Sequence, residues 1–303
     1  MKLVSYGAER AEQPGILLNE RQIVPLAPLL AEAGFPPGLD MNTILASLAV
    51  LQPIIEEALA RNSRVIELAS TRLGPPVPRP EKIIVAGGNY RSHVDEAAGM
   101  VNAPIPTEAI LIFKPSNTVI GPRDNLIRPW QSEKFDYETE IVVVIGRGGH
   151  DIPRARAYDH IAGYMIGNDV TARDMAFKDM HLNPLFAQMT RAKAIRTGAP
   201  IGPWLVTKEE IPDPHKLRLQ CWVNGEPRQD GWSSEMIVDI PGLIEDFSRV
   251  LDLSPGDIIF TGTTRGCGAF QVPPKWLVGG DVVRMEITGL GVMETPIVDA
   301  PRT

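Results

Sequence analysis

The sequence predicts an α+β fold of mixed, mostly antiparallel β-sheets rolled into a barrel or sandwich, with a small N-terminal α/β domain. Strand-like segments separated by turn residues dominate beyond residue 82, and few helical patterns lie between them. A proline-rich run divides this part from the first 70 residues. The chain has 303 residues, 44% of them hydrophobic, which suffices for one large core and a small appended domain.

The first 70 residues are expected to form the small domain. Short strands are predicted at residues 2–5, 15–18 and 23–25, followed by a helix from Asn42, as its N-cap, to Arg61. Pro53 is expected to kink that helix. Residues 71–81 contain four prolines and predict a stiff linker, after which residues 82–303 form the large domain.

Strands dominate the large domain, and turn signals such as Val223-Asn224-Gly225-Glu226 separate them. The predicted strands are residues 82–86, 110–114, 138–145, 161–170, 217–223, 258–261 and 282–287. One clear helix is expected at residues 240–251, where Pro241 suits the first turn.

Two acids open the most apolar of these strands. Glu138 and Glu140 stand directly before the run from Ile141 to Ile145. Alternation along a strand puts both carboxylates on one face, roughly 6.5 to 7 Å apart along the backbone. Like charges at the inner end of a sheet are unfavourable unless they are neutralised, so the pair indicates a metal site. Solvated acids at a strand entrance are the alternative interpretation.

Asp169, at the end of the strand at 161–170, is a candidate third carboxylate ligand. Three carboxylates, with positions left for water and substrate, are typical of Mg²⁺ or Mn²⁺ sites. Zinc prefers cysteine and histidine, and the two cysteines and five histidines show no zinc-ligand spacing. The predicted cofactor is therefore Mg²⁺ or Mn²⁺.

From about Lys82 to Val298 the chain resembles the fumarylacetoacetate hydrolase family, in its acylpyruvase-like or 2-hydroxyhepta-2,4-diene-1,7-dioate isomerase-like branch. The motifs that carry the resemblance, in the family's order, are Gly88-Asn89-Tyr90-Arg91-Ser92-His93, Lys114-Pro115-Ser116, Glu138-Thr139-Glu140, the block from Asn168 to Asp174, Arg191-Ala192-Lys193, Gly202-Pro203, Val223-Asn224-Gly225, the block from Leu253 to Asp257, and Thr261-Gly262-Thr263. The resemblance implies a rolled β fold. It also implies a homodimeric, metal-dependent enzyme that acts on small 2-oxo acids in the catabolism of aromatic compounds.

The resemblance also assigns roles to individual residues. Those implied to bind the metal are Glu138, Glu140 and Asp169. Those implied to act in catalysis are His93 and Glu96, as an acid/base pair on a short lid helix, and Lys193, as an electrophile facing the substrate. Those implied to contact substrate oxygens are Lys114, Arg173 and Thr263.

Simpler structural interpretations stay open for several of these residues. His93 and Glu96, three residues apart, would also suit a surface helix pair. Arg173 would suit an ion pair with its neighbour Asp174, and Lys193 a solvated basic loop.

The favoured function is Mg²⁺-dependent hydrolysis of a carbon–carbon bond in an acylpyruvate-type 2,4-dioxo acid. The metal would stabilise the pyruvate enolate that leaves, while His93 with Glu96 activates water. An isomerase, tautomerase or decarboxylase of a 2-oxo acid needs the same metal triad and is the alternative. A non-catalytic metal-binding scaffold is a third interpretation.

The chain departs from the family pattern at several positions, including these three. Ala176 stands where relatives often carry glutamine, Arg196 where they carry an acid, and Thr264 where they carry proline. Because the metal triad is intact while substrate-facing positions vary, we expect conserved chemistry on an atypical substrate.

Charge and hydropathy exclude other classes. A net charge of −7 with scattered lysine and arginine argues against a nucleic-acid partner, and residues 261–268 lack the ending of a nucleotide-binding loop. The sequence has no signal pattern and no apolar run of about 18 residues, which predicts a cytoplasmic enzyme without membrane contact. Residues 200–206 are a candidate dimer interface, residues 91–106 a candidate mobile lid, and Cys267 a pocket-lining or space-filling residue.

Overall fold

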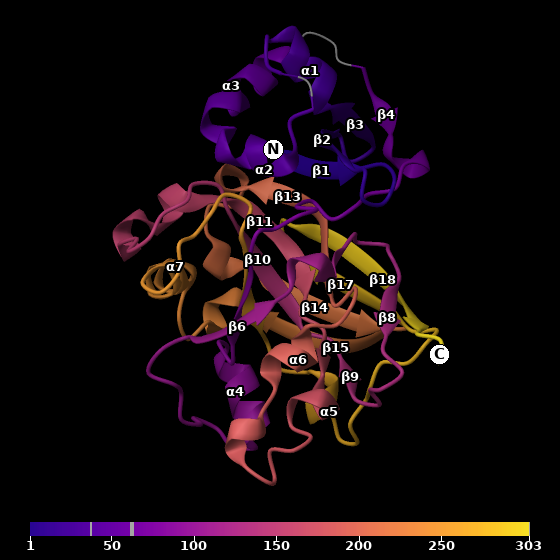
Figure 1. Ribbon diagram of the computed structural model, residues 1–303, viewed down its shortest axis with the longest axis vertical. Coiled ribbons are helices and arrows are strands. Elements are labelled where there is room, and N and C mark those ends of the chain that lie inside the picture. Colours follow the sequence, from indigo (N-terminus) through magenta and orange to yellow (C-terminus); the bar gives the residue numbers. More distant parts are fainter. Residues whose placement is uncertain (37, 61–63, 303) are drawn as a thin grey trace.

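The computed structural model describes residues 1–36, 38–60 and 64–302 and confirms the α+β class (Figure 1). Three sheets are found in this described part of the chain. The largest has the order β4-β3-β2-β1-β13-β11-β10-β16-β5-β6, with β7 beside β13. Its strands are β1 (Lys2–Tyr6), β2 (Gln13–Leu18), β3 (Gln22–Pro25), β4 (Ile66–Glu67), β5 (Ile83–Gly87), β6 (Ile110–Lys114), β7 (Val119–Ile120), β10 (Thr139–Ile145), β11 (Ile161–Asn168), β13 (Ala199–Thr207) and β16 (Ile258–Thr263).

The other two sheets are smaller. The larger of them runs β15-β14-β17-β18-β8, and β12 pairs with β9 in the third. Their strands are β8 (Leu126–Arg128), β9 (Phe135–Asp136), β12 (Thr171–Ala172), β14 (Arg218–Val223), β15 (Glu226–Trp232), β17 (Val282–Ile287) and β18 (Gly291–Asp299). The main sheet ends at β4 and β6 without closing on itself, so the sandwich alternative fits and a closed barrel does not.

Short helices connect these strands. They are α1 (Leu26–Glu32), α2 (Met41–Ala46), α3 (Leu48–Leu59), α4 (Arg91–Ala98), α5 (Arg173–Ala176), α6 (Met189–Lys193) and α7 (Ile240–Ser248). The helix predicted at residues 240–251 is confirmed, three residues shorter at its end.

The single helix predicted from Asn42 to Arg61 is wrong in two respects. The chain forms α2 and α3, with Ser47 between them, and Pro53 lies inside α3 rather than at the break. The N-cap is Asp40, whose carboxylate accepts a hydrogen bond from the Thr43 amide. Arg61 lies outside the described residues.

The N-terminal strands continue the main sheet, because β1 pairs with β13. The proline-rich segment packs along β1. The amide of Gly74 donates to the carbonyl of Ser5, and the Ser5 hydroxyl donates to the carbonyl of Pro76. The division at residues 70 and 82 stays a prediction, although Figure 1 places β1–β4 and α1–α3 together at one end of the molecule.

The core lies on both faces of the central strands. All residues of β10 are buried, and their side chains alternate between two clusters, with Ile141 and Val143 in one and Val142 and Val144 in the other. The predicted dimer interface at residues 200–206 is wrong, because this stretch is β13, a nearly fully buried strand in the middle of the sheet. In the described residues no helix is long and apolar enough to cross a bilayer.

Candidate metal centre and active site

The three predicted metal ligands meet where two central strands end. Glu138 stands just before β10, Glu140 is its second residue, and Asp169 directly follows β11. The amide of Asp169 donates to the carbonyl of Glu138 over 2.9 Å. This bond holds the residue before β10 beside the residue after β11. All three acids are buried, and a carboxylate oxygen from each lies within 4.8 Å of the others. The solvated-acid interpretation is therefore wrong.

Three cations surround these carboxylates. Lys193 Nζ donates to Glu138 Oε2 over 3.2 Å and also to Asp169 Oδ2, while its remaining contact is Thr171 Oγ1 at 3.1 Å. Lys114 Nζ donates to the other oxygen of Asp169 over 2.7 Å. Arg173 joins Glu138 at 2.5 Å, so every oxygen of Glu138 and Asp169 has a cationic partner.

Glu140 differs from the other two acids. One of its oxygens accepts a hydrogen bond of 2.7 Å from the Gly262 amide, and within the described part of the chain its other oxygen has no hydrogen-bond partner. Burial, followed by the charges of Asp169 and Glu138, raises the pKa of Glu140 well above 4.5. Burial also opposes ionisation of Glu138, but Lys193 and Arg173 outweigh it and lower its pKa.

The donor set fits a hard divalent cation. It consists only of carboxylate oxygens, as Mg²⁺ and Mn²⁺ prefer, and it lies at the inner end of a sheet. Counting Asp136, which Arg173 also contacts, four buried carboxylates face two buried lysines and the partly buried Arg173. A divalent cation would turn this excess of one negative charge into an excess of one positive charge, which favours an anionic substrate.

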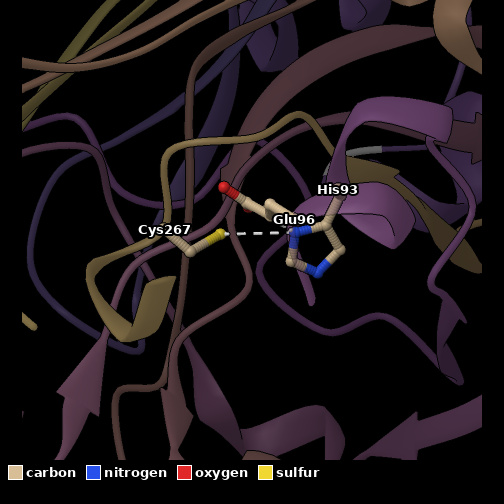
Figure 2. A group of neighbouring side chains, drawn as sticks. All are labelled: His93, Glu96 and Cys267. Atoms are coloured by element: carbon tan, nitrogen blue, oxygen red, sulfur yellow. Dashed lines mark hydrogen bonds and ion pairs between the residues drawn. The ribbon is translucent and has the colours of Figure 1, made fainter. Parts of the chain in front are cut away.

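His93 and Glu96 form the predicted pair on α4. Nδ1 of His93 lies 2.9 Å from Glu96 Oε1, and the amide of Gly266 donates to Glu96 Oε2 over 2.8 Å. Figure 2 shows the thiol of Cys267 facing Nδ1, at 3.8 Å, while the other ring nitrogen points away from it. Both side chains of the pair are only 11% exposed. The surface-pair interpretation therefore does not hold.

In this structure the predicted lid is docked rather than free. α4 ends at Gly99, whose φ of 64° suits a left-handed C-cap, and Asp95 accepts hydrogen bonds from Arg91 and from the Ala103 amide. His93 also packs edge-on against Phe270, with ring centroids 5.6 Å apart. Its orientation is therefore fixed by contacts on several sides.

The residues predicted to contact substrate are placed differently from one another. Lys114 and Arg173 form ion pairs with Asp169 and Glu138, two of the predicted metal ligands. The hydroxyl of Thr263 donates a hydrogen bond to the Thr139 carbonyl and accepts one from Gln229. Both its donor and its acceptor capacity are therefore used within the protein. Substrate contact by these residues stays a prediction.

Arg173 does not pair with Asp174 in the described structure. Instead Asp174 accepts hydrogen bonds from the Ser132 hydroxyl and the Glu133 amide, so it ties α5 to the loop before β9. Arg173 bridges Asp136, at 3.0 Å, and Glu138.

Several residues that organise the site were missed at the sequence level. Asp136 accepts hydrogen bonds from the amides of Gly268 and Ala269 as well as from Arg173. These bonds tie the glycine-rich turn to the segment that precedes Glu138. Gln229 links Thr263 to the Thr264 carbonyl from a strand more than 30 residues away. The only signal for Asp136 was its place in the acidic run Asp136-Tyr137-Glu138.

The three departures from the family pattern lie in different settings. Ala176 is fully buried, and Thr264 is buried with a hydroxyl that finds no partner among the described residues. Arg196 is exposed and lines a hollow of about 740 Å³ together with Arg72 and Asp124. That hollow does not include the metal ligands.

Gly262→Ala is expected to lower the free energy of unfolding by roughly 1–3 kcal/mol and to weaken metal binding. Gly262 has a φ of 96°, and a Cβ there would lie 3.0 Å from Asn89 Cβ and 3.2 Å from the Ala86 carbonyl oxygen. Urea unfolding and Mn²⁺ titration measure the two effects. Gly225→Ala, with φ 80° but open space around the new methyl, is the matched control and should leave metal binding unchanged.

A buried carboxylate triad with cations around it, and a His–Glu pair beside it, defines a metal-dependent enzyme. Residues 82–298 match the model of the family described as "Fumarylacetoacetate (FAA) hydrolase C-terminal". The chain belongs to the fumarylacetoacetate hydrolase family, as the sequence predicted.

Individual relatives share much of the chain. This chain is 38% identical over 243 residues to the protein named oxaloacetate tautomerase fahd2, mitochondrial, of Xenopus laevis. The matched region covers 80% of this chain and 73% of the Xenopus protein. A probable 2-hydroxyhepta-2,4-diene-1,7-dioate isomerase from Mycobacterium abscessus is 34% identical with a TM-score of 0.82, each chain being covered completely. The maleylpyruvate hydrolase from Sphingobium sp. SYK-6, in complex with manganese(II) ion and pyruvate, is 28% identical with a TM-score of 0.80; the match covers 99% of this chain and 100% of that one.

Proposed function

We propose that this protein is a Mg²⁺- or Mn²⁺-dependent tautomerase of a small 2-oxo dicarboxylic acid of the oxaloacetate type. The observation that carries the proposal is the pairing of an all-carboxylate metal triad with a preorganised His–Glu pair. Together they provide charge stabilisation for an enolate and a group that moves a proton. The oxaloacetate tautomerase name of a relative 38% identical over 80% of the chain supports this reaction.

Glu138, Glu140 and Asp169 would hold the ion. When bound, the cation supplies Lewis-acid stabilisation of the enolate oxygen of a 2-oxo acid. Lys193 and Lys114 hold Asp169 from both sides, and Arg173 holds Glu138, so the carboxylates are oriented before the ion arrives.

His93 is the proton carrier in this proposal. Since Glu96 is a carboxylate that accepts hydrogen bonds, it favours the tautomer with the proton on Nδ1, and it leaves Nε2 free to take a proton. Gly266 in turn fixes Glu96 through its second oxygen. His93 can thus remove a proton from the carbon beside the 2-oxo group and return it to the enolate oxygen.

Hydrolysis of an acylpyruvate, the reaction favoured from the sequence, is the second candidate. The same His93–Glu96 pair would activate a water molecule, and the maleylpyruvate hydrolase shares the fold over the whole chain. Tautomerisation ranks first because it needs no water site and agrees with the curated relatives.

Ultraviolet absorbance separates the candidates. Oxaloacetate and a series of acylpyruvates are mixed with protein in Mg²⁺ and then in EDTA, and pyruvate is assayed in each mixture. Protein- and metal-dependent decay of the oxaloacetate enol band without pyruvate supports the tautomerase. Pyruvate released from acylpyruvates supports the hydrolase, pyruvate from oxaloacetate a decarboxylase, and no turnover of any substrate a non-catalytic scaffold.

His93→Gln is expected to lower kcat by roughly 10²- to 10⁴-fold while metal binding is retained, since His93 carries the proton and does not bind the ion. The enol-decay assay and Mn²⁺ titration measure the two properties. His150→Gln, at a histidine whose side chain is 73% exposed, is the control and should behave like the wild type. A His93→Gln protein with unchanged kcat would remove this residue from the mechanism.

A further inference from the structure

Next to the carboxylate triad lies a second group of metal-ligating side chains. His93, Glu96 and Cys267 each offer one ligand atom, and these atoms lie within 4.8 Å of one another. Nδ1 of His93 is 2.9 Å from Glu96 Oε1 and 3.8 Å from Cys267 Sγ. Figure 2 shows the carboxylate, the ring and the thiol converging from α4 and the glycine-rich turn.

The chemistry of this group differs from that of the triad. One nitrogen, one sulfur and one oxygen are the ligand types of zinc, whereas Mg²⁺ disfavours nitrogen and sulfur. Tetrahedral zinc, with bonds of about 2.0 Å to nitrogen or oxygen and about 2.3 Å to sulfur, places its ligand atoms roughly 3.3–3.6 Å apart. The two separations from His93 Nδ1, 2.9 Å and 3.8 Å, lie on either side of this range, and the third pair of ligand atoms lies within 4.8 Å.

The ligand positions are already fixed by other contacts. The Gly266 amide holds the second oxygen of Glu96, and Phe270 packs edge-on against the His93 ring. Cys267 follows Gly266 directly and is fully buried. Ordered ligands reduce the entropy lost when a metal binds.

We propose that His93, Glu96 and Cys267 form a zinc site, separate from the carboxylate triad, and that zinc bound there inhibits the enzyme. Binding releases the thiol proton to solvent and forms bonds from zinc to Sγ, Nδ1 and Oε1, with water as the fourth ligand.

Inhibition follows from the two nitrogens of the imidazole ring. When zinc occupies Nδ1 of a neutral imidazole, the ring proton resides on Nε2, which can no longer accept a proton from a substrate. Glu96 is withdrawn from His93 at the same time. This inhibitory effect rests on the proposed proton transfer by His93, whereas zinc binding itself does not.

Three measurements on the Mg²⁺-loaded protein of residues 1–303 test the site. Zn²⁺ is added to the protein in excess Mg²⁺, which keeps the triad filled, and the rate of enol decay is measured at each Zn²⁺ concentration. A second titration measures zinc binding by competition with a chromophoric zinc indicator. Co²⁺ is then added as a probe, because cobalt bound to a thiolate gives a charge-transfer band in the near ultraviolet. The variants are Cys267→Ser and, as the matched control, Cys221→Ser at the other buried cysteine, which lies on β14.

We expect one zinc ion to bind per chain. The Zn²⁺ concentration that gives half-inhibition should rise by about tenfold or more in Cys267→Ser and stay unchanged in Cys221→Ser. The cobalt band should be present in the wild type and absent from Cys267→Ser. Equal zinc affinity of the wild type and Cys267→Ser, or no thiolate band in the wild type, would overturn the site. Zinc binding without inhibition would overturn the effect on His93.

The cobalt and indicator experiments need no substrate. If no 2-oxo acid is turned over, the proposed function fails, but these two measurements still decide whether the zinc site exists. Thermal unfolding of both serine variants establishes that each is folded under the conditions of the titration.

Discussion

Glu140→Gln is expected to abolish metal-dependent turnover while the metal-free protein becomes at least as stable as the wild type. The side chain is a proposed metal ligand, yet in the described part of the chain it forms no salt bridge, and it lies beside the carboxylates of Glu138 and Asp169. Replacing it removes a ligand and also removes electrostatic repulsion in a buried site. Turnover should fall by about 10³-fold or more, and urea unfolding in EDTA measures the stability.

The pH dependence of the metal-free proteins provides a further check. The folded-state pKa of Glu140 is raised well above the ordinary value of 4.5, mainly because of burial. Below that ordinary value both the folded and the unfolded wild type carry the proton. As pH rises above 4.5, the unfolded state releases the proton first, so this group lowers the stability of the folded state. The stability advantage of Glu140→Gln should therefore grow above about pH 4.5, and a gap that shrinks would contradict the assignment.

Asp169→Asn is expected to abolish turnover too, but to lower the free energy of unfolding by about 3 kcal/mol or more. Among the described residues, Asp169 is the carboxylate partner of Lys114, whose side chain is fully buried, and one of two carboxylate partners of Lys193. Its removal leaves buried positive charge without compensation, the reverse of the situation at Glu140. Urea unfolding in EDTA compares the two variants directly.

A double variant separates this electrostatic cause from a packing cause. Adding Lys114→Met to Asp169→Asn removes the uncompensated cation and should recover part of the lost stability, with turnover still absent. If Asp169→Asn is as stable as Glu140→Gln, or if the added substitution recovers nothing, the cations do not have the role described.

The clustering of the three predicted metal ligands could be expected from the sequence because the information is local. Glu138 and Glu140 are two residues apart, and Asp169 stands at the end of a clear apolar strand. The partners of these acids could not be predicted, because Lys114 and Lys193 come from segments 55 and 24 residues away from Asp169. Spacing along the chain does not reveal that both lysines donate hydrogen bonds to Asp169.

The same distinction between local and distant information applies to the fold. Strands such as β6 and β17 have the predicted bounds because their apolar residues and turns are contiguous. The strand β13 was missed because Gly202 and Pro203 lie inside it, and both residues are disfavoured in strands. The pairing of β1 with β13 joins residues about 200 positions apart, and no local pattern indicates it.

Cys267 illustrates what only the folded structure provides. In the sequence it is one residue of a glycine-rich turn, more than 170 positions from His93. The fold places its sulfur against the ring nitrogen that also contacts Glu96. The sequence suggested a pocket-lining or space-filling residue, and the contact adds a ligand with its own metal preference.

Calorimetric titration of Mn²⁺ into metal-free wild type and Glu140→Gln, each with and without pyruvate, tests the central claim most directly. We expect one ion to bind per chain in the wild type, more tightly in the presence of pyruvate, and pyruvate binding to depend on the metal. Glu140→Gln should bind neither the ion nor pyruvate. Equal Mn²⁺ binding by the two proteins, or pyruvate binding that is independent of the metal, would contradict the claim that the carboxylate triad recruits a 2-oxo acid through its cation.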